Sequence, residues 1–145
     1  MIFLLDTNVV SELRKAPGNA RGVLKANARV LAWVRKQSTV ACWLSCVTIL
    51  EVETGVLRME RRDPEQGAVL RGWLEKQLLP AFASRILPVD LPVARMCATL
   101  QVPDPCSYRD SLIAATALVH KMTVVTRNTA DFEATGVPLL NPWES

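Results

Sequence analysis

Short apolar runs alternate along the chain with longer segments in which apolar side chains recur every three or four positions. The short runs have the length of strands and carry few polar residues, as expected for strands that are covered on both faces. They lie at residues 2–5, 40–45, 86–87, 123–126 and 137–140. The periodic segments predict helices over residues 9–15, 23–37, 49–62, 64–80, 91–102 and 110–121.

This alternation of strands and helices is typical of a parallel sheet with helices on both faces. We therefore predict an α/β fold, a three-layer α/β/α sandwich with a central, mostly parallel sheet. The 145 residues suit one domain, since domains usually take about 100–200 residues. The turn sequences Pro17-Gly18 and Pro103-Asp104-Pro105 are too short to be domain linkers. The prediction is a single domain over residues 1–145.

Charge is unevenly distributed along the chain. The formal net charge of +3 is by itself too weak to indicate nucleic-acid binding. Residues 13–50, however, hold seven basic side chains and no acidic one, so this segment carries +7 and the remainder −4. Such a segment could face an anion, or it could be a solvated helix face whose charges only aid solubility.

Several classes of protein are excluded by the composition. A single histidine, His120, rules out a metal site built from several histidines and makes a histidine-centred catalytic triad a poor hypothesis. The four cysteines form no C-x-x-C pair of the zinc-ribbon or thioredoxin type. The chain has no signal-peptide pattern at its start and no apolar run near the ~18–20 residues of a membrane span. We expect a cytoplasmic protein without a membrane segment.

Acidic side chains near the ends of predicted strands are the most informative feature of the sequence. Ligands of an open α/β sheet bind beyond the carboxyl ends of its strands. Asp6 directly follows the first predicted strand, and Asp131 lies a few residues after the fourth. Glu51 and Glu53 lie in the early turns of the helix after the second strand, but two residues apart on a helix they cannot both face the same way. Asp110 starts a helix, so its place in such a cluster depends on the fold.

A cluster of these acids would imply a specific chemistry. Neighbouring carboxylates repel one another unless a cation compensates them, and oxygen ligands suit Mg²⁺ or Mn²⁺. Such an ion can activate a water molecule and stabilise charge on a phosphoryl group, which points to phosphodiester hydrolysis. Taken singly, each acid could instead be a helix cap or a solvated charge. Arg109 and Arg127 flank the set and could hold an RNA phosphate, pair with the acids or serve only the surface.

Four segments, in this order, match a known family of ribonucleases. They read FLLDTNVVSE over residues 3–12, TILEVETG over 48–55, DSLIAATA over 110–117 and VTRNTADF over 125–132. With these segments the chain resembles, over essentially its full length, PIN-domain ribonucleases of the VapC or FitB type, the toxins of bacterial toxin–antitoxin pairs. One departure is visible: the stretch 17–29, which carries several basic residues, looks longer than the usual loop between the first two helices.

The resemblance implies which acids form the site. The family has its glutamate four residues before a glycine, and Gly55 places that position at Glu51. Asp6 and Asp110 match two further acids, and Asp131 looks like the fourth. Together these residues would be the catalytic, metal-holding set for Mg²⁺, with Mn²⁺ as a substitute. The matching supporting positions are Thr7, Asn8, Thr126 and Asn128.

The function implied by the resemblance is that of a Mg²⁺-dependent endoribonuclease, the toxin of a toxin–antitoxin pair. Its partners would be RNA, a cognate antitoxin that covers the acidic site, and a second copy of the chain in a homodimer or higher oligomer. The candidate contacts to RNA are Arg109, Arg127, Arg14 and Lys15. A PIN-like module that binds partners without turnover is the alternative. A small-molecule phosphatase or nucleotide-binding protein is a third hypothesis, but the sequence lacks a glycine-rich phosphate loop.

Overall fold

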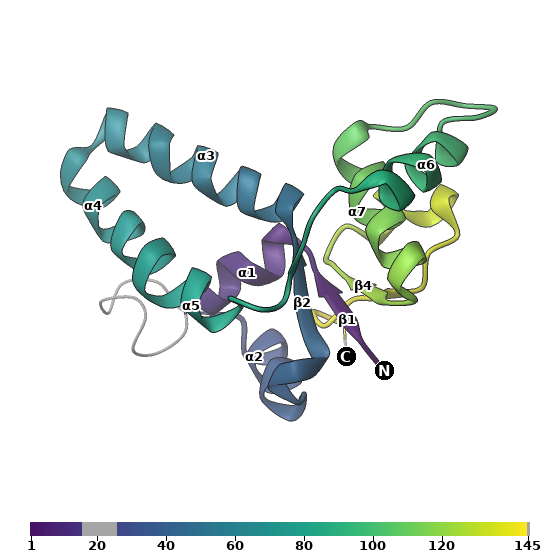
Figure 1. The fold of residues 1–145 in the computed structure, drawn as a ribbon. Helices are drawn as coiled ribbons and strands as arrows, with labels where there is room; N and C mark the ends of the chain where they lie inside the picture. The colour runs from purple at the N-terminus through teal and green to yellow at the C-terminus, as the bar shows by residue number, and fades with distance from the viewer. Residues whose placement is uncertain (16–25, 145) are drawn as a thin grey trace.

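The computed structural model describes residues 1–15 and 26–144, which contain a five-stranded sheet in the order β3-β2-β1-β4-β5 (Figure 1). Every neighbouring pair of strands in this sheet is parallel. The strands are β1 (Phe3–Leu5), β2 (Cys42–Ser45), β3 (Ile86–Leu87), β4 (Thr123–Val125) and β5 (Leu139–Leu140). The central strand β1 pairs with β2 on one side and with β4 on the other, so the predicted parallel sheet is confirmed.

Helices cover both faces of this sheet, which confirms the three-layer α/β/α architecture (Figure 1). They are α1 (Thr7–Arg14), α2 (Ala28–Lys36), α3 (Cys46–Arg62), α4 (Pro64–Trp73), α5 (Leu79–Ala81), α6 (Leu91–Leu100) and α7 (Tyr108–His120). Successive side chains of β1 point to opposite faces. Phe3 belongs to a buried cluster with Val9 of α1 and Trp33 of α2, whereas Leu4 belongs to a separate buried cluster with Ile113 of α7.

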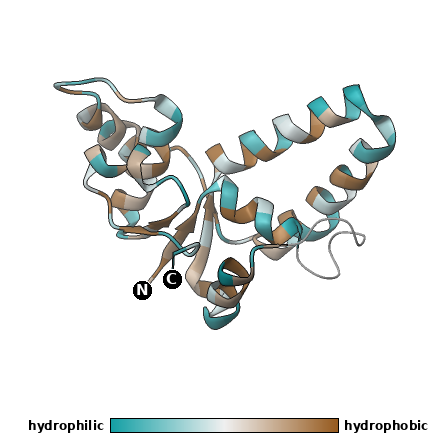
Figure 2. Cartoon of the chain, turned by 180° about the vertical axis from the view of Figure 1, so that it is seen from behind, coloured by the Kyte–Doolittle hydropathy of each residue, from teal (hydrophilic) through white to brown (hydrophobic). Residues whose placement is uncertain are grey.

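The colouring by hydropathy follows this arrangement. In Figure 2 the strands in the middle of the molecule are brown, and the helices around them alternate between brown and teal. Such two-sided helices bury one face against the sheet and leave the other in water. Within residues 1–15 and 26–144, none of the helices combines the length and the apolar character that a bilayer crossing requires.

Helices α3 and α4 form an arm that extends away from the sheet and returns to it (Figure 1). Arg71 of α4 holds the two helices together through ion pairs with Glu53 and Glu60 of α3, and it also pairs with Glu75. Gly67 of α4 lies so close to α3 that a Cβ at this position would be 2.4 Å from the Cα of Glu60. The arm is therefore a tightly packed unit.

Several helices begin earlier than the apolar pattern predicts, because a polar side chain before the pattern caps the helix. The Asp6 carboxylate accepts the N–H of Thr7 at 2.8 Å, so α1 starts at residue 7 rather than 9. Ser45 caps α3, which starts at residue 46 rather than 49. Ser107 caps α7, which starts at residue 108 rather than 110 and places Asp110 in its first turn. A side-chain oxygen that satisfies the free N–H groups fixes each helix start.

Other boundaries differ in the opposite direction. Helix α2 begins at residue 28, because the Asn27 side chain accepts the N–H groups of Arg29 and Val30. The predicted start of this helix at residue 23, and the basic residues Arg21 and Lys25, lie outside the described residues. The predicted second strand is shorter by two residues, since residues 39–41 form a 3-10 helix before β2.

Candidate active site

The candidate site lies at the carboxyl ends of β1 and β4, where the strand order reverses. The chain builds the sheet outward from β1 through β2 to β3, and it then adds β4 on the other side of β1. Ligand sites of open α/β sheets form at this kind of reversal. Asp6 follows β1 and Thr126 follows β4, and the Thr126 hydroxyl donates a 2.8 Å hydrogen bond to Oδ2 of Asp6.

Asp6 is the most deeply buried acid of the site, with a relative exposure of 0%. Its second oxygen, Oδ1, accepts the capping N–H of Thr7, so the residue that ends β1 also starts α1. Burying a carboxylate is costly unless hydrogen bonds and a counter-charge compensate it. Thr7 and Thr126 supply hydrogen bonds from uncharged donors, and the counter-charge comes from another residue.

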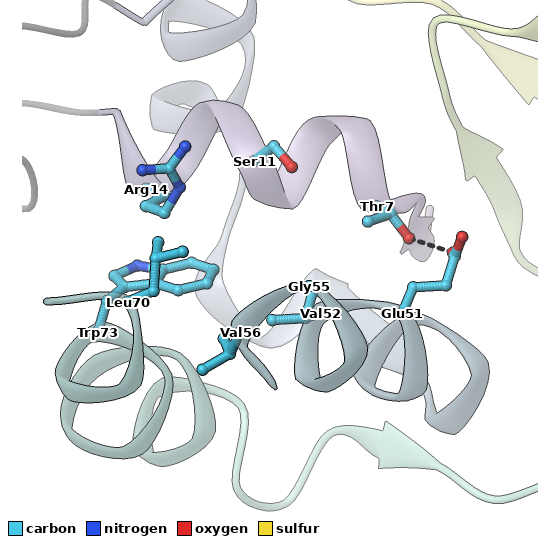
Figure 3. Close-up of a pocket in the computed structure, with 9 residues that line it drawn as sticks. All are labelled: Thr7, Ser11, Arg14, Glu51, Val52, Gly55, Val56, Leu70 and Trp73. Atoms are coloured by element: carbon cyan, nitrogen blue, oxygen red, sulfur yellow. Dashed lines mark hydrogen bonds between the residues drawn. The ribbon is translucent and has the colours of Figure 1, made fainter. Parts of the chain in front are cut away.

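Glu51 reaches the same place from the second turn of α3. The Thr7 hydroxyl donates a 2.6 Å hydrogen bond to Oε1 of Glu51, and Figure 3 shows the two side chains pointing toward each other from α1 and α3. Burial alone would raise the pKa of Glu51, but hydrogen bonds from Arg109 and Thr7 outweigh it and hold this pKa below its usual range. Glu53, two residues further on, instead pairs with Arg71 on the arm, so the structure brings Glu51 and not Glu53 to the site.

Arg109 lies among the carboxylates and contacts three of them. Its Nη2 is 2.6 Å from Oδ1 of Asp6 and 2.7 Å from Oε1 of Glu51. Its Nε donates to Oε2 of Glu51 at 2.8 Å, and its Nη1 donates to Oδ1 of Asp110 at 2.6 Å. Burial lowers the pKa of Arg109, but the bonds with Glu51 and the charge of Asp6 raise it above its ordinary value. The guanidinium therefore stays charged.

The first turn of α7 brings Arg109 and Asp110 to the site. The Ser107 hydroxyl accepts the N–H of Asp110 at 3.1 Å and fixes where this turn begins. Further along α7, Ile113 and Ala114 are fully buried against the sheet and set the position of the helix. The location of Asp110, which the sequence pattern alone leaves open, is thus determined by a cap and by packing.

Polar side chains organise the loop that follows β4. The Thr126 hydroxyl accepts the side-chain N–H of Asn8 at 3.3 Å and the backbone N–H of Asn128 at 3.0 Å. The side-chain oxygen of Asn8 accepts the backbone N–H of Arg127 at 3.3 Å. The supporting positions predicted from the resemblance therefore form one hydrogen-bond network, which fixes the two strand ends relative to each other.

The side chain of Asp131 is not joined to this network. It is exposed on a 3-10 helix, Thr129–Asp131, that follows the loop after β4. Within the part of the chain that the structure describes, no hydrogen bond or ion pair links its side chain to Asp6, Glu51 or Asp110. Its role as a fourth metal-holding residue stays a prediction.

The cations predicted to contact RNA differ in their surroundings. Arg109 pairs with the acids, and Lys15 lies 3.5 Å from the Glu12 carboxylate. The guanidinium of Arg127 lies over the ring of Trp143, 5.5 Å from its centre. Arg14 lines a pocket of about 180 Å³ between α1, α3 and α4.

This pocket continues from the acidic site along the arm. Figure 3 shows Thr7 and Glu51 at one end of it and Arg14 above Trp73 at the other. Val52, Val56 and Leu70 give it an apolar wall. The site therefore opens onto a groove with one polar and one apolar part.

The donor set suits a hard divalent cation. Carboxylate and hydroxyl oxygens are the ligands that Mg²⁺ and Mn²⁺ prefer. As the side chains lie, however, no three Asp, Glu, His or Cys side chains of residues 1–15 and 26–144 are grouped closely enough to hold a metal ion. Arg109 lies between the acids and already satisfies them. Pairing with the acids was one of the roles that the sequence left open for Arg109. The only feature of the sequence that indicated it is the position of Arg109 next to Asp110.

Comparisons with known proteins match the chain over nearly its whole length. The family described as "PIN domain" matches residues 3–137. The VapC ribonuclease Y4jK of Sinorhizobium fredii is 37% identical over 148 residues, which cover 99% of each chain. The toxin FitB of Neisseria gonorrhoeae is 38% identical, covering 98% of this chain and 99% of that protein. In the crystal structure of FitAcB from Neisseria gonorrhoeae, the matching chain is 37% identical with a TM-score of 0.86, over 99% of this chain and 100% of that one.

Proposed function

This chain belongs to the PIN-domain family, and on that basis we propose that it is a Mg²⁺-dependent endoribonuclease, the toxin of a toxin–antitoxin pair. The observation that carries the proposal is the convergence of Asp6, Glu51 and Asp110 on one cation at the end of the sheet. The family match spans residues 3–137, which supports one PIN domain over residues 1–145.

The three carboxylates would hold Mg²⁺, or Mn²⁺ in its place, with Asp131 as a fourth ligand. When bound, the ion lowers the pKa of a water molecule and stabilises the negative charge that develops at phosphorus. Thr126 and Thr7 orient the oxygens of Asp6 and Glu51 through the hydrogen bonds described above. Such supporting contacts fix the geometry of ligands and usually change metal affinity or activity 10–100-fold.

The substrate proposed is RNA, held through its phosphates. Arg127, Arg14 and Lys15 are cations on the elements that border the site, and cations of this kind bind the backbone without reading sequence. Arg14 lines the groove that opens from Glu51. A single strand laid along that groove would bring a phosphodiester to the acids.

We also propose a small antitoxin partner and self-association. A relative 37% identical to this chain was solved as FitAB bound to a DNA fragment, with a TM-score of 0.84. The present chain would pair with an antitoxin that covers the acidic site. Exposed apolar side chains near α6 and α7, including Leu91, Val102 and Tyr108, offer area for a homodimer or higher oligomer. The expected location is the cytoplasm.

The decisive experiment is cleavage of RNA by the purified chain. Wild-type protein should cleave with Mg²⁺ or Mn²⁺, EDTA should stop it, and Asp6→Asn should reduce the rate on the order of 100-fold or more. Asp104→Asn is the matched control, because Asp104 is exposed in a proline-rich loop away from the site. Cleavage that survives both EDTA and Asp6→Asn would contradict the proposed function.

The alternative, a PIN-like module that acts only through partner binding, is favoured by one observation. Arg109 already pairs with all three acids, so a cationic group lies where the metal would bind. Calorimetric titration with Mg²⁺ separates the two hypotheses: heat of binding at millimolar Mg²⁺ supports the nuclease, and its absence together with intact antitoxin binding supports the module.

A further inference from the structure

We propose that the side chain of Arg109 occupies the site of the divalent metal ion. It competes with the ion for the same carboxylates and has to leave before the ion binds. The inference rests on the proposed function, because it concerns the same carboxylates. It goes beyond that function because it assigns to one side chain, Arg109, the control of the affinity for the metal ion.

The first argument is the number and quality of the contacts. All three nitrogen groups of the guanidinium bond to carboxylate oxygens, and they reach three acids from three separate segments. Arg109 and Asp110 are neighbours in sequence, but Asp6 is 103 positions and Glu51 58 positions away. Such charge-assisted bonds are about twice as strong as neutral ones. The guanidinium therefore fills the space between the three carboxylates with well-formed hydrogen bonds to each of them.

The second argument is the cost of leaving the acids without a cation. Asp6 is fully buried, and both other acids are partly buried. Removing the partner of a buried charge is strongly destabilising, because the remaining charge is neither solvated nor compensated. Arg109 supplies part of this compensation, because its guanidinium pairs with all three acids and lets them lie close together.

The third argument is that metal and guanidinium need the same oxygens. Oδ1 of Asp6 and Oε1 of Glu51 both lie within 2.7 Å of Nη2 of Arg109. Each of these two oxygens also accepts a hydrogen bond from Thr7, so with Arg109 in place both of its lone pairs are used. A Mg²⁺ ion, which binds its oxygens at about 2.0–2.1 Å, needs one of these lone pairs and would take the one that Arg109 holds. Binding of the metal is therefore an exchange, and its apparent affinity falls with the fraction of molecules in which Arg109 occupies the site.

The fourth argument is that Arg109 can leave without dismantling the site. Its side chain is 33% exposed, and it projects from the first turn of α7, next to the exposed Tyr108. Asp6 is also held by Thr126 and by the N–H of Thr7. Glu51 is also held by the Thr7 hydroxyl, which itself accepts a 3.4 Å hydrogen bond from Nη2 of Arg109. Once released, the long side chain reaches solvent at the rim of the same site, while the carboxylates keep their positions.

The test is metal affinity measured directly, without any cleavage assay. Calorimetric titration of the full chain with MnCl₂ at constant ionic strength is compared for wild type, Arg109→Gln and the control Arg95→Gln, which removes an exposed arginine of α6. We expect Arg109→Gln to bind Mn²⁺ at least about tenfold more tightly than wild type. Its metal-free Tm should be lower and its gain in Tm with Mn²⁺ larger, whereas Arg95→Gln should match wild type in all three values.

A second measurement uses the wild-type protein and so does not depend on the folding of a variant. In the NMR spectrum of the metal-free chain, the Nε–H of Arg109 should give a signal protected from solvent exchange. Addition of Mg²⁺ should remove that protection in step with binding. Arg109→Lys, which keeps the charge but not the fork of donors, should give an intermediate Mn²⁺ affinity.

The outcomes separate this inference from the proposed function. If wild type and Arg109→Gln bind Mn²⁺ equally well, and Asp6→Asn abolishes binding, then the metal site is real and the competition is wrong. The competition is equally overturned if the Nε–H of Arg109 stays protected in the Mg²⁺-saturated protein. If neither wild type nor Arg109→Gln binds Mn²⁺ at millimolar concentration, the metal-dependent function fails and the inference with it.

Discussion

The hydroxyl of Thr7 donates a 2.6 Å hydrogen bond to Oε1 of Glu51, which ties the first residue of α1 to the second turn of α3 (Figure 3). The backbone N–H of the same residue bonds to Asp6. Thr7 thus fixes two carboxylates that come from different segments of the chain, Glu51 through its side chain and Asp6 through its main chain.

Removal of this hydroxyl should therefore impair the reaction more than the fold. For Thr7→Val we expect a loss of RNA cleavage of about 10–100-fold, the range found for groups that orient metal ligands. Thr7→Ser, which keeps the donor, should retain most of the activity. The cleavage rate and the Tm are measured together, and a Thr7→Ser variant as damaged as Thr7→Val would contradict the assignment of the effect to the hydroxyl.

The close approach of α4 to α3 predicts a destabilising substitution far from the acids. In Gly67→Ala the added Cβ would meet the backbone of Glu60 at 2.4 Å, so the two helices have to separate. We expect a loss of about 1–3 kcal/mol of stability, as for other overpacked sites. Gly72→Ala in the same helix is the matched control, because a Cβ there meets nothing within 4 Å. It should be neutral or stabilising by about 0.4–1 kcal/mol in chemical denaturation.

The ion pairs of Arg71 predict a pH dependence of stability. Its hydrogen bonds hold the pKa of Glu60 below the usual range. A carboxylate whose pKa is lower in the folded state stabilises the fold above its unfolded pKa of about 4.3 and loses that effect as the pH falls through the folded value. Glu60→Gln should lower the Tm at pH 7, and the difference from wild type should vanish in acid. In an Arg71→Gln background the substitution should make no such pH-dependent difference, and a persistent one would contradict the assignment to this pair.

Asp131 should matter less than the acids that contact Arg109. Since it is exposed and lies outside their contacts, we expect Asp131→Asn to reduce cleavage about tenfold, against the order of 100-fold expected for Asp6→Asn. A higher Mg²⁺ concentration should recover much of the loss. Cleavage rates over a Mg²⁺ titration give the comparison, and a loss as deep as that of Asp6→Asn at every concentration would place Asp131 among the central ligands.

Sequence patterns predict the strands and the first acids well, because both depend on local chemistry. An apolar run that stops at Asp6 is enough to place this residue at the end of a strand in an α/β sheet. Helix starts were predicted less well, since Ser45 and Ser107 cap their helices before the apolar pattern begins. The periodicity of apolar residues contains no information on a cap that precedes it.

The remaining site geometry depends on contacts between distant segments. The position of Asp110 is set by the packing of α7 on the sheet, which no spacing in the sequence reveals. Arg109 stands beside Asp110 in the chain, but its bonds with Asp6 and Glu51 need the strand order β2-β1-β4 and the start of α7 together. From the residues alone, a phosphate contact, an ion pair with the acids and a simple surface role were all open interpretations of this arginine.

The strand order also determines when the site can exist during translation. Asp6 leaves the ribosome first, but its partners Arg109 and Thr126 are synthesised 103 and 120 positions later. Its own strand remains without the neighbour β4 until that last part of the chain emerges. A nascent chain, or one ended early by a damaged message, therefore carries Asp6 and Glu51 but lacks Arg109, Asp110 and Thr126, which complete the site.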